Sequence, residues 1–311
     1  MPFIAACIFT ACDDSLKGEL FEKKVLINQN GFQEYSLDFV GTSEQDTMFT
    51  VAVSGSEKTD KDIVVTLTVN ADTLAGYNWE RFRNDESQYY ELLPPDMYSF
   101  QTDNIVIKAG TEYTSVPVTF YLDKFDREAK YILPVSIAAV SEYTVAEPQY
   151  STILMNTVLS NEYSGSFSLS GTITEVETGD RLDIQTTRTL RAESENSVSL
   201  YAGNIAENAT ARENYRIMMT VNDDNTLSFE PVHPEIIELT ADEPAHIEDP
   251  ESFVNMVSVT RQVDAQNSRR VFVTTTFHMS YNYIDKTDPD TPIEYRWSGM
   301  ASRSETITLR Q

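Results

Sequence analysis

The chain has 311 residues, with 23 lysines and arginines against 49 aspartates and glutamates, and a formal net charge of -26. Binding to nucleic acid requires clustered basic side chains that release counterions from the phosphate backbone, so this composition excludes a nucleic-acid-binding protein. Hydrophobic residues make up 41% of the chain, which is enough for two domains with buried cores and excludes a disordered protein.

The N-terminal residues are apolar and include both cysteines of the chain, Cys7 and Cys12. The folded part is therefore expected to contain no disulfide, Cys-based metal site or thiol nucleophile. The apolar stretch is too short to span a bilayer and is typical of the end of a secretion signal. The segment Phe9-Thr10-Ala11-Cys12, followed by two aspartates, resembles the lipobox of surface-exposed bacterial lipoproteins, which implies lipidation at Cys12. The other interpretation is an apolar N-terminal strand.

Residues 23–160 show the alternation of apolar and polar side chains that is typical of half-buried strands, as in Phe49, Val51 and Val53. One helix is predicted over Asp72 to Asn84, with Asp72 or Thr73 as its N-terminal cap. About seven short strands in this length favour an immunoglobulin-like β-sandwich.

A new series of strands begins after Asn161, so residues 161–311 are predicted to form a second domain, and residues 1–22 a signal remnant and tether. Asn222 to Asn225 form a predicted hairpin turn. The alternation over Arg270 to Ile284 predicts a strand much longer than usual, and the last strand, Ile293 to Leu309, keeps a similar phase. Long strands favour an antiparallel, lipocalin-like β-barrel, with a barrel-like sandwich as the alternative. The predicted fold class is thus all-β.

Two sets of motifs extend these predictions. The first half contains, in order, Tyr77-Asn78, Tyr90-Glu91-Leu92-Leu93-Pro94 and Tyr131-Ile132-Leu133-Pro134-Val135. These motifs resemble the immunoglobulin-like domain of unknown function that heads many surface lipoproteins of Sus-like polysaccharide-utilisation loci. Tyr163-Ser164-Gly165-Ser166-Phe167 and Arg296-Trp297-Ser298-Gly299 resemble the β-rich domain that usually follows it.

This resemblance implies a protein that is lipid-anchored to the outer membrane and exposed at the cell surface. It implies a glycan-binding or accessory role beside an outer-membrane transporter and its lid lipoprotein, with contact to the membrane only through the lipid. The acidic charge favours a neutral polysaccharide or oligosaccharide as the ligand, because a negative field repels polyanions.

No sequence motif for a catalytic nucleophile, a phosphate-binding loop, a zinc site or a dinucleotide site is present. The three histidines, His233, His246 and His278, are far apart, so neither a metal site nor a cofactor is expected. The acidic loop from Asp285 to Asp290 has oxygen ligands at odd spacings, but Lys286 and Pro289 interrupt them and favour a solvated hairpin loop over a calcium site.

Sugar binding requires exposed aromatic faces beside groups that form hydrogen bonds with hydroxyls. The terminal hairpin offers one such set, in either an open barrel mouth or a packed core, comprising Tyr281, Asn282, Tyr283, Tyr295, Arg296 and Trp297. Trp79 on the predicted helix is a second candidate, as an exposed platform or as a residue over the seam between helix and sheet.

These observations favour a non-catalytic protein that binds glycans or supports a transporter. Two alternatives remain at this point. One is a structural spacer or adhesin subunit that has no ligand site. The other is a glycoside hydrolase, since two carboxylates at a suitable separation need no sequence motif.

Overall fold

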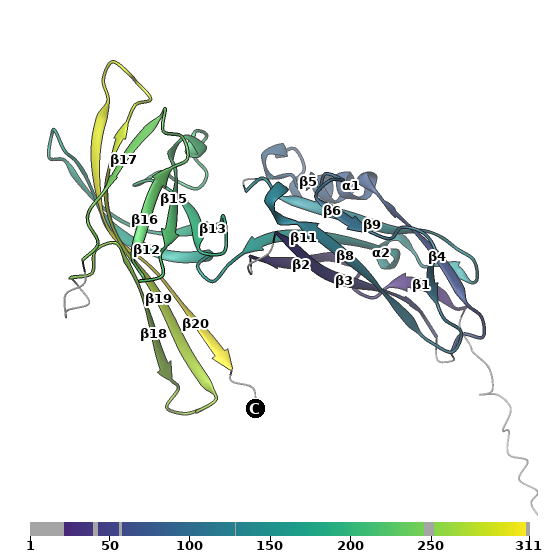
Figure 1. The fold of residues 1–311 in the computed structure, drawn as a ribbon. Helices are drawn as coiled ribbons and strands as arrows, with labels where there is room; N and C mark the ends of the chain where they lie inside the picture. The colour runs from purple at the N-terminus through teal and green to yellow at the C-terminus, as the bar shows by residue number, and fades with distance from the viewer. Residues whose placement is uncertain (1–21, 40–42, 56–57, 128, 246–251, 309–311) are drawn as a thin grey trace, which may run out of the picture. The chain divides into compact units, whose positions relative to one another are not determined.

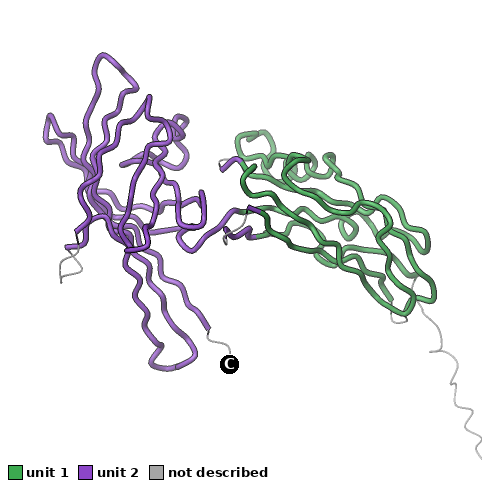
Figure 2. Tube along the Cα trace, viewed as in Figure 1, with its two compact units in different colours: residues 1–35, 44–125, 129–158 green, residues 36–43, 126–128, 159–311 purple. Residues whose placement is uncertain are grey.

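The structure is a computed structural model that describes residues 22–39, 43–55, 58–127, 129–245 and 252–308. The chain forms two compact units, the first comprising residues 1–35, 44–125 and 129–158, and the second residues 36–43, 126–128 and 159–311 (Figure 2). Nearly all of the regular structure is β-strand. Within the described residues, no helix is both long enough and apolar enough to cross a lipid bilayer.

The first unit is built on two facing sheets (Figure 1). One sheet has the order β10 (Thr144–Val145), β1 (Lys24–Ile27), β3 (Glu44–Val53), β8 (Tyr113–Tyr121) and β6 (Tyr98–Phe100). The other has the order β2 (Gly31–Asp38), β11 (Thr152–Ser160), β9 (Tyr131–Val140), β4 (Ile63–Val69) and β7 (Ile105–Ile107), with β5 (Glu91–Leu92) beside β9. The predicted alternation holds in β3, where Phe49 and Val51 are fully buried.

One helix, α1 (Ala71–Phe82), covers the second of these sheets. Its Leu74 packs with Ile132 of β9 and Leu154 of β11, which explains why β9 is buried on both faces. The predicted cap is wrong: the side chain of Asn70 accepts a hydrogen bond from the Thr73 backbone N–H at 3.2 Å. An asparagine oxygen placed before the first turn satisfies an N–H that has no partner within the helix.

Asn78 fixes the segment that follows α1. Its side-chain amide donates to the Tyr90 carbonyl at 2.8 Å, and its oxygen accepts from the Tyr90 backbone N–H at 3.0 Å. These two bonds hold Tyr90 against α1, where it joins Phe32 and Tyr77 around the Leu74 cluster. The shorter helical elements of this unit are η1 (Glu86–Gln88), η2 (Leu122–Lys124) and α2 (Pro148–Ser151).

The second unit is a nine-stranded antiparallel sheet in the order β16, β15, β14, β13, β12, β20, β19 and β17, with β18 also paired to β19. The bounds are β12 (Gly165–Glu175), β13 (Arg181–Ala192), β14 (Ser197–Tyr201), η3 (Arg212–Tyr215), β15 (Arg216–Val221), β16 (Leu227–Pro231), β17 (Ile237–Ala241), β18 (Met256–Val263), β19 (Arg270–Asp285) and β20 (Ile293–Thr308).

The sheet curls until its ends nearly meet. The Leu227 N–H donates to the Asn255 carbonyl at 2.8 Å, and the Val257 N–H donates to the Asn225 carbonyl at 2.9 Å, so the start of β18 joins the turn before β16. The all-β prediction, with a sandwich followed by a barrel-like sheet, is confirmed. The two long strands are confirmed as well: β19 and β20 have 16 residues each, because β19 pairs with β18 along its first part and with β17 along its last.

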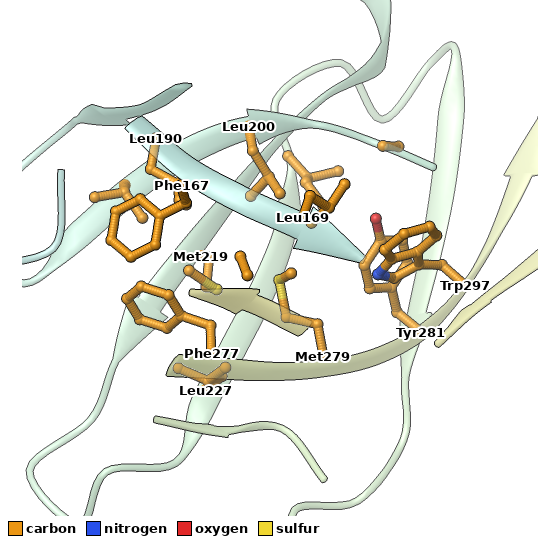
Figure 3. Close-up of a cluster of buried hydrophobic side chains, with 14 of the residues drawn as sticks. Phe167, Leu169, Leu190, Leu200, Met219, Leu227, Phe277, Met279, Tyr281 and Trp297 are labelled. Carbon is orange, nitrogen blue, oxygen red and sulfur yellow. The ribbon is translucent and has the colours of Figure 1, made fainter. Parts of the chain in front are cut away.

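The core of the second unit consists of the alternate residues that face the inside of this sheet. Figure 3 shows Phe277 of β19 near Phe167 of β12, Met279 near Leu169, and Tyr281 beside Trp297. A side-chain period of two places every second residue of a strand on one face. The interior of the barrel is therefore filled by side chains along most of its length.

Candidate functional site

Two of the predicted sugar-binding residues lie in the barrel core. Trp297 is directly opposite Tyr281 across β19 and β20, and each is 1% exposed. The Trp297 ring lies against two facing glycines, Gly171 and Gly299, so closely that a Cβ on either would come within 3.0 Å of it. Of the two alternatives for this hairpin, the packed core applies to Trp297 and Tyr281. Neither ring offers a free face to a sugar.

The predicted polar partners lie on the other face of the same strands. Adjacent residues of a strand point in opposite directions, so Asn282 and Arg296 are separated from the aromatic residues by the sheet itself. They pair with each other instead, with the Arg296 Nε donating to the Asn282 Oδ1 at 3.2 Å. The Asn282 amide also donates to Glu294 at 3.0 Å. The expectation that these residues supply hydrogen bonds beside the aromatic rings is corrected by this arrangement.

The next pair along the hairpin reaches the end of the barrel. Tyr283 and Tyr295 are cross-strand partners, and their rings are stacked with centroids 5.2 Å apart and planes inclined by 28°. Tyr283 is buried, whereas Tyr295 is partly exposed. This pair borders a pocket of about 260 Å³, which we call the barrel-end pocket.

The barrel-end pocket is assembled from several separate segments. Its buried members, Ile173 of β12 and Tyr283 of β19, form the floor. The other lining residues are partly or fully exposed and comprise Glu175, Asp180, Arg181, Leu182, Asn204, Ile205, Tyr215, Asp285 and Tyr295. The pocket thus combines aromatic rings at its base with carboxylates, an amide and one guanidinium around them.

Tyr215 and Tyr295 bring phenol groups to the lining of the pocket. The Tyr215 hydroxyl donates to Asp285 Oδ2 at 2.8 Å and lies 3.0 Å from the Thr287 hydroxyl. Burial raises the pKa of Tyr215 above its usual value, and burial together with the negative charges of Glu175 and Asp285 raises the pKa of Tyr295. Both phenols therefore stay neutral at ordinary pH and can donate or accept hydrogen bonds.

We expect the second unit to lose stability steeply above about pH 10. Burial raises the pKa of Tyr281 and Tyr283 well above the value they have in an unfolded chain. The unfolded state thus releases these protons first as the pH rises, and each tyrosine lowers the free energy of unfolding by about 1.4 kcal/mol per pH unit. The stabilisation is fully present below pH 10 and is lost above it. Urea unfolding at a series of pH values measures this slope.

The matched variant for this prediction is Tyr283→Phe. It removes one titrating hydroxyl and keeps the ring, so the decline of stability with pH should become shallower. Tyrosinate absorbance followed during the same titrations should rise together with unfolding. An unchanged slope in the variant would show that Tyr283 is not responsible.

Trp79, the other predicted aromatic site, lies on the outer face of α1 in the first unit. Its side chain is 52% exposed, while Leu74 and Asn78 of the same helix are buried. A Cβ at Gly76, one turn earlier, would meet no atom within 4 Å. Of the two alternatives, the exposed platform describes Trp79 better than a position over the seam. Trp79 does not line the barrel-end pocket.

The described histidines have separate partners. His233 lies 3.2 Å from Glu235, and His278 contacts Ser258 and the ring of Phe253. In the described ranges, no group of three or more His, Cys, Asp or Glu side chains is arranged to hold a metal ion. The acidic loop after β19 is stabilised by hydrogen bonds between its own residues: Asp288 accepts from Thr291 and from the Asp290 N–H. His246, Cys7 and Cys12 lie outside the described residues, so lipidation at Cys12 stays a prediction.

Sequence reasoning missed most of the pocket. Glu175, Tyr215 and Asp285 are up to 110 residues apart along the chain and are brought together by the barrel. The sequence pattern places Asp285 only in a solvated loop and gives no signal for Tyr215 as a site residue. The one available signal was the phase of the last two strands, which places Tyr283 and Tyr295 on the interior face close to the connecting loop.

Two family models match the sequence: a model described as an N-terminal domain covers residues 21–144, and one described as C-terminal covers residues 151–301. The fold is similar to that of a protein of unknown function from Bacteroides ovatus, with 24% identity and a TM-score of 0.76 over 93% of this chain and 96% of that one. Together the two models cover most of the chain, in the order N-terminal and then C-terminal. A multidomain protein from Bacteroides ovatus is also similar, with 24% identity and a TM-score of 0.74 over 91% of this chain and 95% of that one.

A third similar structure carries a functional description. It is an auxiliary nutrient binding protein from Bacteroides thetaiotaomicron, with 17% identity and a TM-score of 0.68 over 89% of this chain and 92% of that one. At these levels of identity the similarity shows a shared fold. None of the curated proteins matches the sequence.

Proposed function

We propose that the protein is a non-catalytic, carbohydrate-binding accessory component of a Sus-like polysaccharide uptake system. In this proposal Cys12 carries the lipid that anchors the chain to the outer membrane at the cell surface. The partners are an outer-membrane transporter and its lid lipoprotein. The auxiliary nutrient binding protein with the same fold supports an accessory binding role.

The observation that carries the proposal is the barrel-end pocket. Aromatic rings bind the C–H faces of sugars, while carboxylates, amides and neutral phenols bind hydroxyls. Tyr283 and Tyr295 supply the rings, and Glu175, Asp285 and Asn204 supply acceptors and a donor. The pocket thus combines a stacked aromatic pair with polar groups of both kinds, as a sugar site requires.

The ligand proposed for this pocket is a neutral sugar. Three carboxylates, from Glu175, Asp180 and Asp285, line it, against the single guanidinium of Arg181. Like charges raise the free energy of a bound anion, and the net charge of -26 acts in the same direction at longer range. Uronic acids and sulfated glycans should therefore bind more weakly than uncharged ones.

We expect Tyr295→Ala to weaken binding of a neutral polysaccharide about tenfold, since stacking on an aromatic ring contributes roughly 1.5 kcal/mol. The measurement is affinity electrophoresis and calorimetry of the purified chain, without its lipid, against starch, xylan, mannan, galactan and levan. Phe272→Ala is the matched control, because Phe272 is an exposed aromatic residue of β19 that does not line the pocket. Trp79→Ala tests the exposed ring of the first unit in the same assay.

Chromatography of every retained glycan separates the possible outcomes. Retention without cleavage, lost in Tyr295→Ala and kept in Phe272→Ala, supports the proposal. Release of shorter products would instead make the protein a glycoside hydrolase, with Glu175 and Asp285 as the first carboxylates to replace. Binding lost only in Trp79→Ala would move the site to the first unit. Absence of binding to every polysaccharide would favour a structural spacer.

A further inference from the structure

We infer that the barrel-end pocket receives the terminal sugar unit of a glycan and not a stretch within the chain. This inference rests on the proposed function, and it specifies the form of the ligand. It follows from the volume of the pocket, from the hydrogen bonds that close its sides and from the position of its aromatic pair.

The volume of the pocket limits the length of its ligand. Sites for drug-sized molecules have volumes of about 300 to 1,000 Å³. The barrel-end pocket, at about 260 Å³, lies just below this range. It can hold one sugar ring with its hydroxyls, whereas several linked rings would exceed it.

Hydrogen bonds hold together the neighbouring segments that form the sides of the pocket. On one side, the Val176 N–H donates to the Glu294 carbonyl at 2.9 Å, which ties the turn after β12 to the start of β20. On another side, Tyr215 is bonded to Asp285 and lies beside Thr287 at the end of β19. A groove for the interior of a chain must be open at both ends, and segments tied together in this way would not provide one.

A third set of contacts closes the side formed by the segment after β14. The Ala202 N–H donates to the Tyr215 carbonyl at 2.8 Å, and the Gly203 N–H donates to the Tyr281 hydroxyl at 3.2 Å. Gly203 also lies directly over the floor, since a Cβ there would come within 2.9 Å of the side chains of Tyr283 and Ile173. Asn204 and Ile205 are thereby held in the wall of the pocket.

The chemistry of the pocket matches a single neutral ring. Tyr295 is partly exposed and backed by Tyr283, so it presents a ring for the C–H face of one sugar. Glu175 and Asp285 both lie close enough to Tyr295 for their charges to raise its pKa. Hydroxyls at the edge of a sugar stacked on Tyr295 would therefore face acceptors. The rest of the glycan leaves through the mouth into solvent.

The test is calorimetry of the intact protein with malto-, xylo- and manno-oligosaccharides from the disaccharide to the hexasaccharide. If the pocket holds one terminal unit, the molar affinity for the recognised sugar should stay within about twofold across the series, a difference of ~0.4 kcal/mol. The corresponding free monosaccharide should compete for the same site. Tyr295→Ala should lower the affinity by the same factor at every length, while Phe272→Ala should leave it unchanged.

Modified ends identify which terminus enters the pocket. Borohydride reduction of the hexasaccharide opens its reducing-end ring, and an alkylated sugar blocks the other end, so loss of binding in either sample supports end recognition. Affinity that rises with every added unit, or that survives modification of both ends, overturns end recognition but preserves carbohydrate binding. Absence of binding to all oligosaccharides and to all polysaccharides would overturn both proposals.

Discussion

Replacing Trp297 with alanine should lower the free energy of unfolding of the second unit by about 3 to 5 kcal/mol. The ring is 1% exposed and is among the largest fully buried side chains of the protein. It lies opposite Tyr281 and against the Gly171–Gly299 pair, whose missing side chains make the space that it fills. Backbone hydrogen bonds hold the neighbouring strands in place, so these strands can fill only part of the cavity that the missing ring leaves. The lost contacts are therefore not replaced.

The loss should come from packing and not from a hydrogen bond. Among the described residues, the Trp297 indole N–H has no hydrogen-bond partner. Trp297→Phe, which keeps an aromatic ring and removes the unpaired donor, should consequently cost much less than Trp297→Ala. Trp79→Ala is the control, because that ring is mostly exposed and its removal should change stability by less than about 0.5 kcal/mol.

Urea unfolding followed by circular dichroism, with calorimetry of the same proteins, measures the difference. The chain divides into two compact units, so two transitions are expected, and only the transition of the second unit should move in Trp297→Ala. A shift below about 1 kcal/mol would mean that the ring is not a core side chain. In that case Trp297 would return as a candidate for sugar binding.

The behaviour of Trp297 shows which part of the barrel its sequence could predict. Alternation along β19 and β20 correctly indicates that Tyr281, Tyr283, Tyr295 and Trp297 share a face, since a period of two is a local property of the strand. Whether a ring at a given position is covered depends on the residues opposite it. Gly171 is 126 positions from Trp297, and nothing in the local pattern links the two.

Buried asparagines are a second feature that local patterns did not reveal. Asn255 is fully buried, and its amide donates to the carbonyls of Asp242 and Ser280 while its oxygen accepts from the Ser280 N–H. These bonds join β18 to the strands beside it at the point where the sheet closes. The sequence around Asn255 is typical of an ordinary loop, because its hydrogen-bond partners are distant in sequence and come together only in the folded chain.

The lining of the barrel-end pocket could not be predicted either, because its residues are distant in sequence and meet only in the folded barrel. Its floor and walls come from β12, β13 and the turn between them, the segment after β14, η3 and the terminal hairpin, and each contributes one to three residues. None of these short contributions has a spacing that marks a site, in contrast to a metal or phosphate motif carried on one loop. Of the residues predicted from the terminal hairpin, Tyr283 and Tyr295 line the pocket, whereas the residues that surround them carry no signal in the sequence.

Replacing Gly299 with alanine should destabilise the second unit by about 3 kcal/mol, through a backbone collision and not through loss of flexibility. A Cβ at this position would lie 2.4 Å from the Ser170 carbonyl oxygen and 2.6 Å from the Gly171 Cα. Both are backbone atoms of β12, so no rotation of a side chain can relieve the contact. The two strands must separate where Trp297 packs over them.

Three variants isolate this cause. Ser298→Ala changes the exposed neighbour on the same strand and should leave the free energy of unfolding nearly unchanged. Gly76→Ala should raise the stability of α1 by about 1 kcal/mol, because the added Cβ meets no other atom. Gly299→Ala should remain destabilising when combined with Trp297→Phe, since the closest contacts involve the backbone. Full rescue of stability by the smaller ring would contradict the backbone collision.

Gly299→Ala should also weaken binding at the barrel-end pocket. Tyr295 lies on β20 only four residues from Gly299, so a separation of β20 from β12 should displace it. Calorimetry of Gly299→Ala below its unfolding transition would detect the weaker binding.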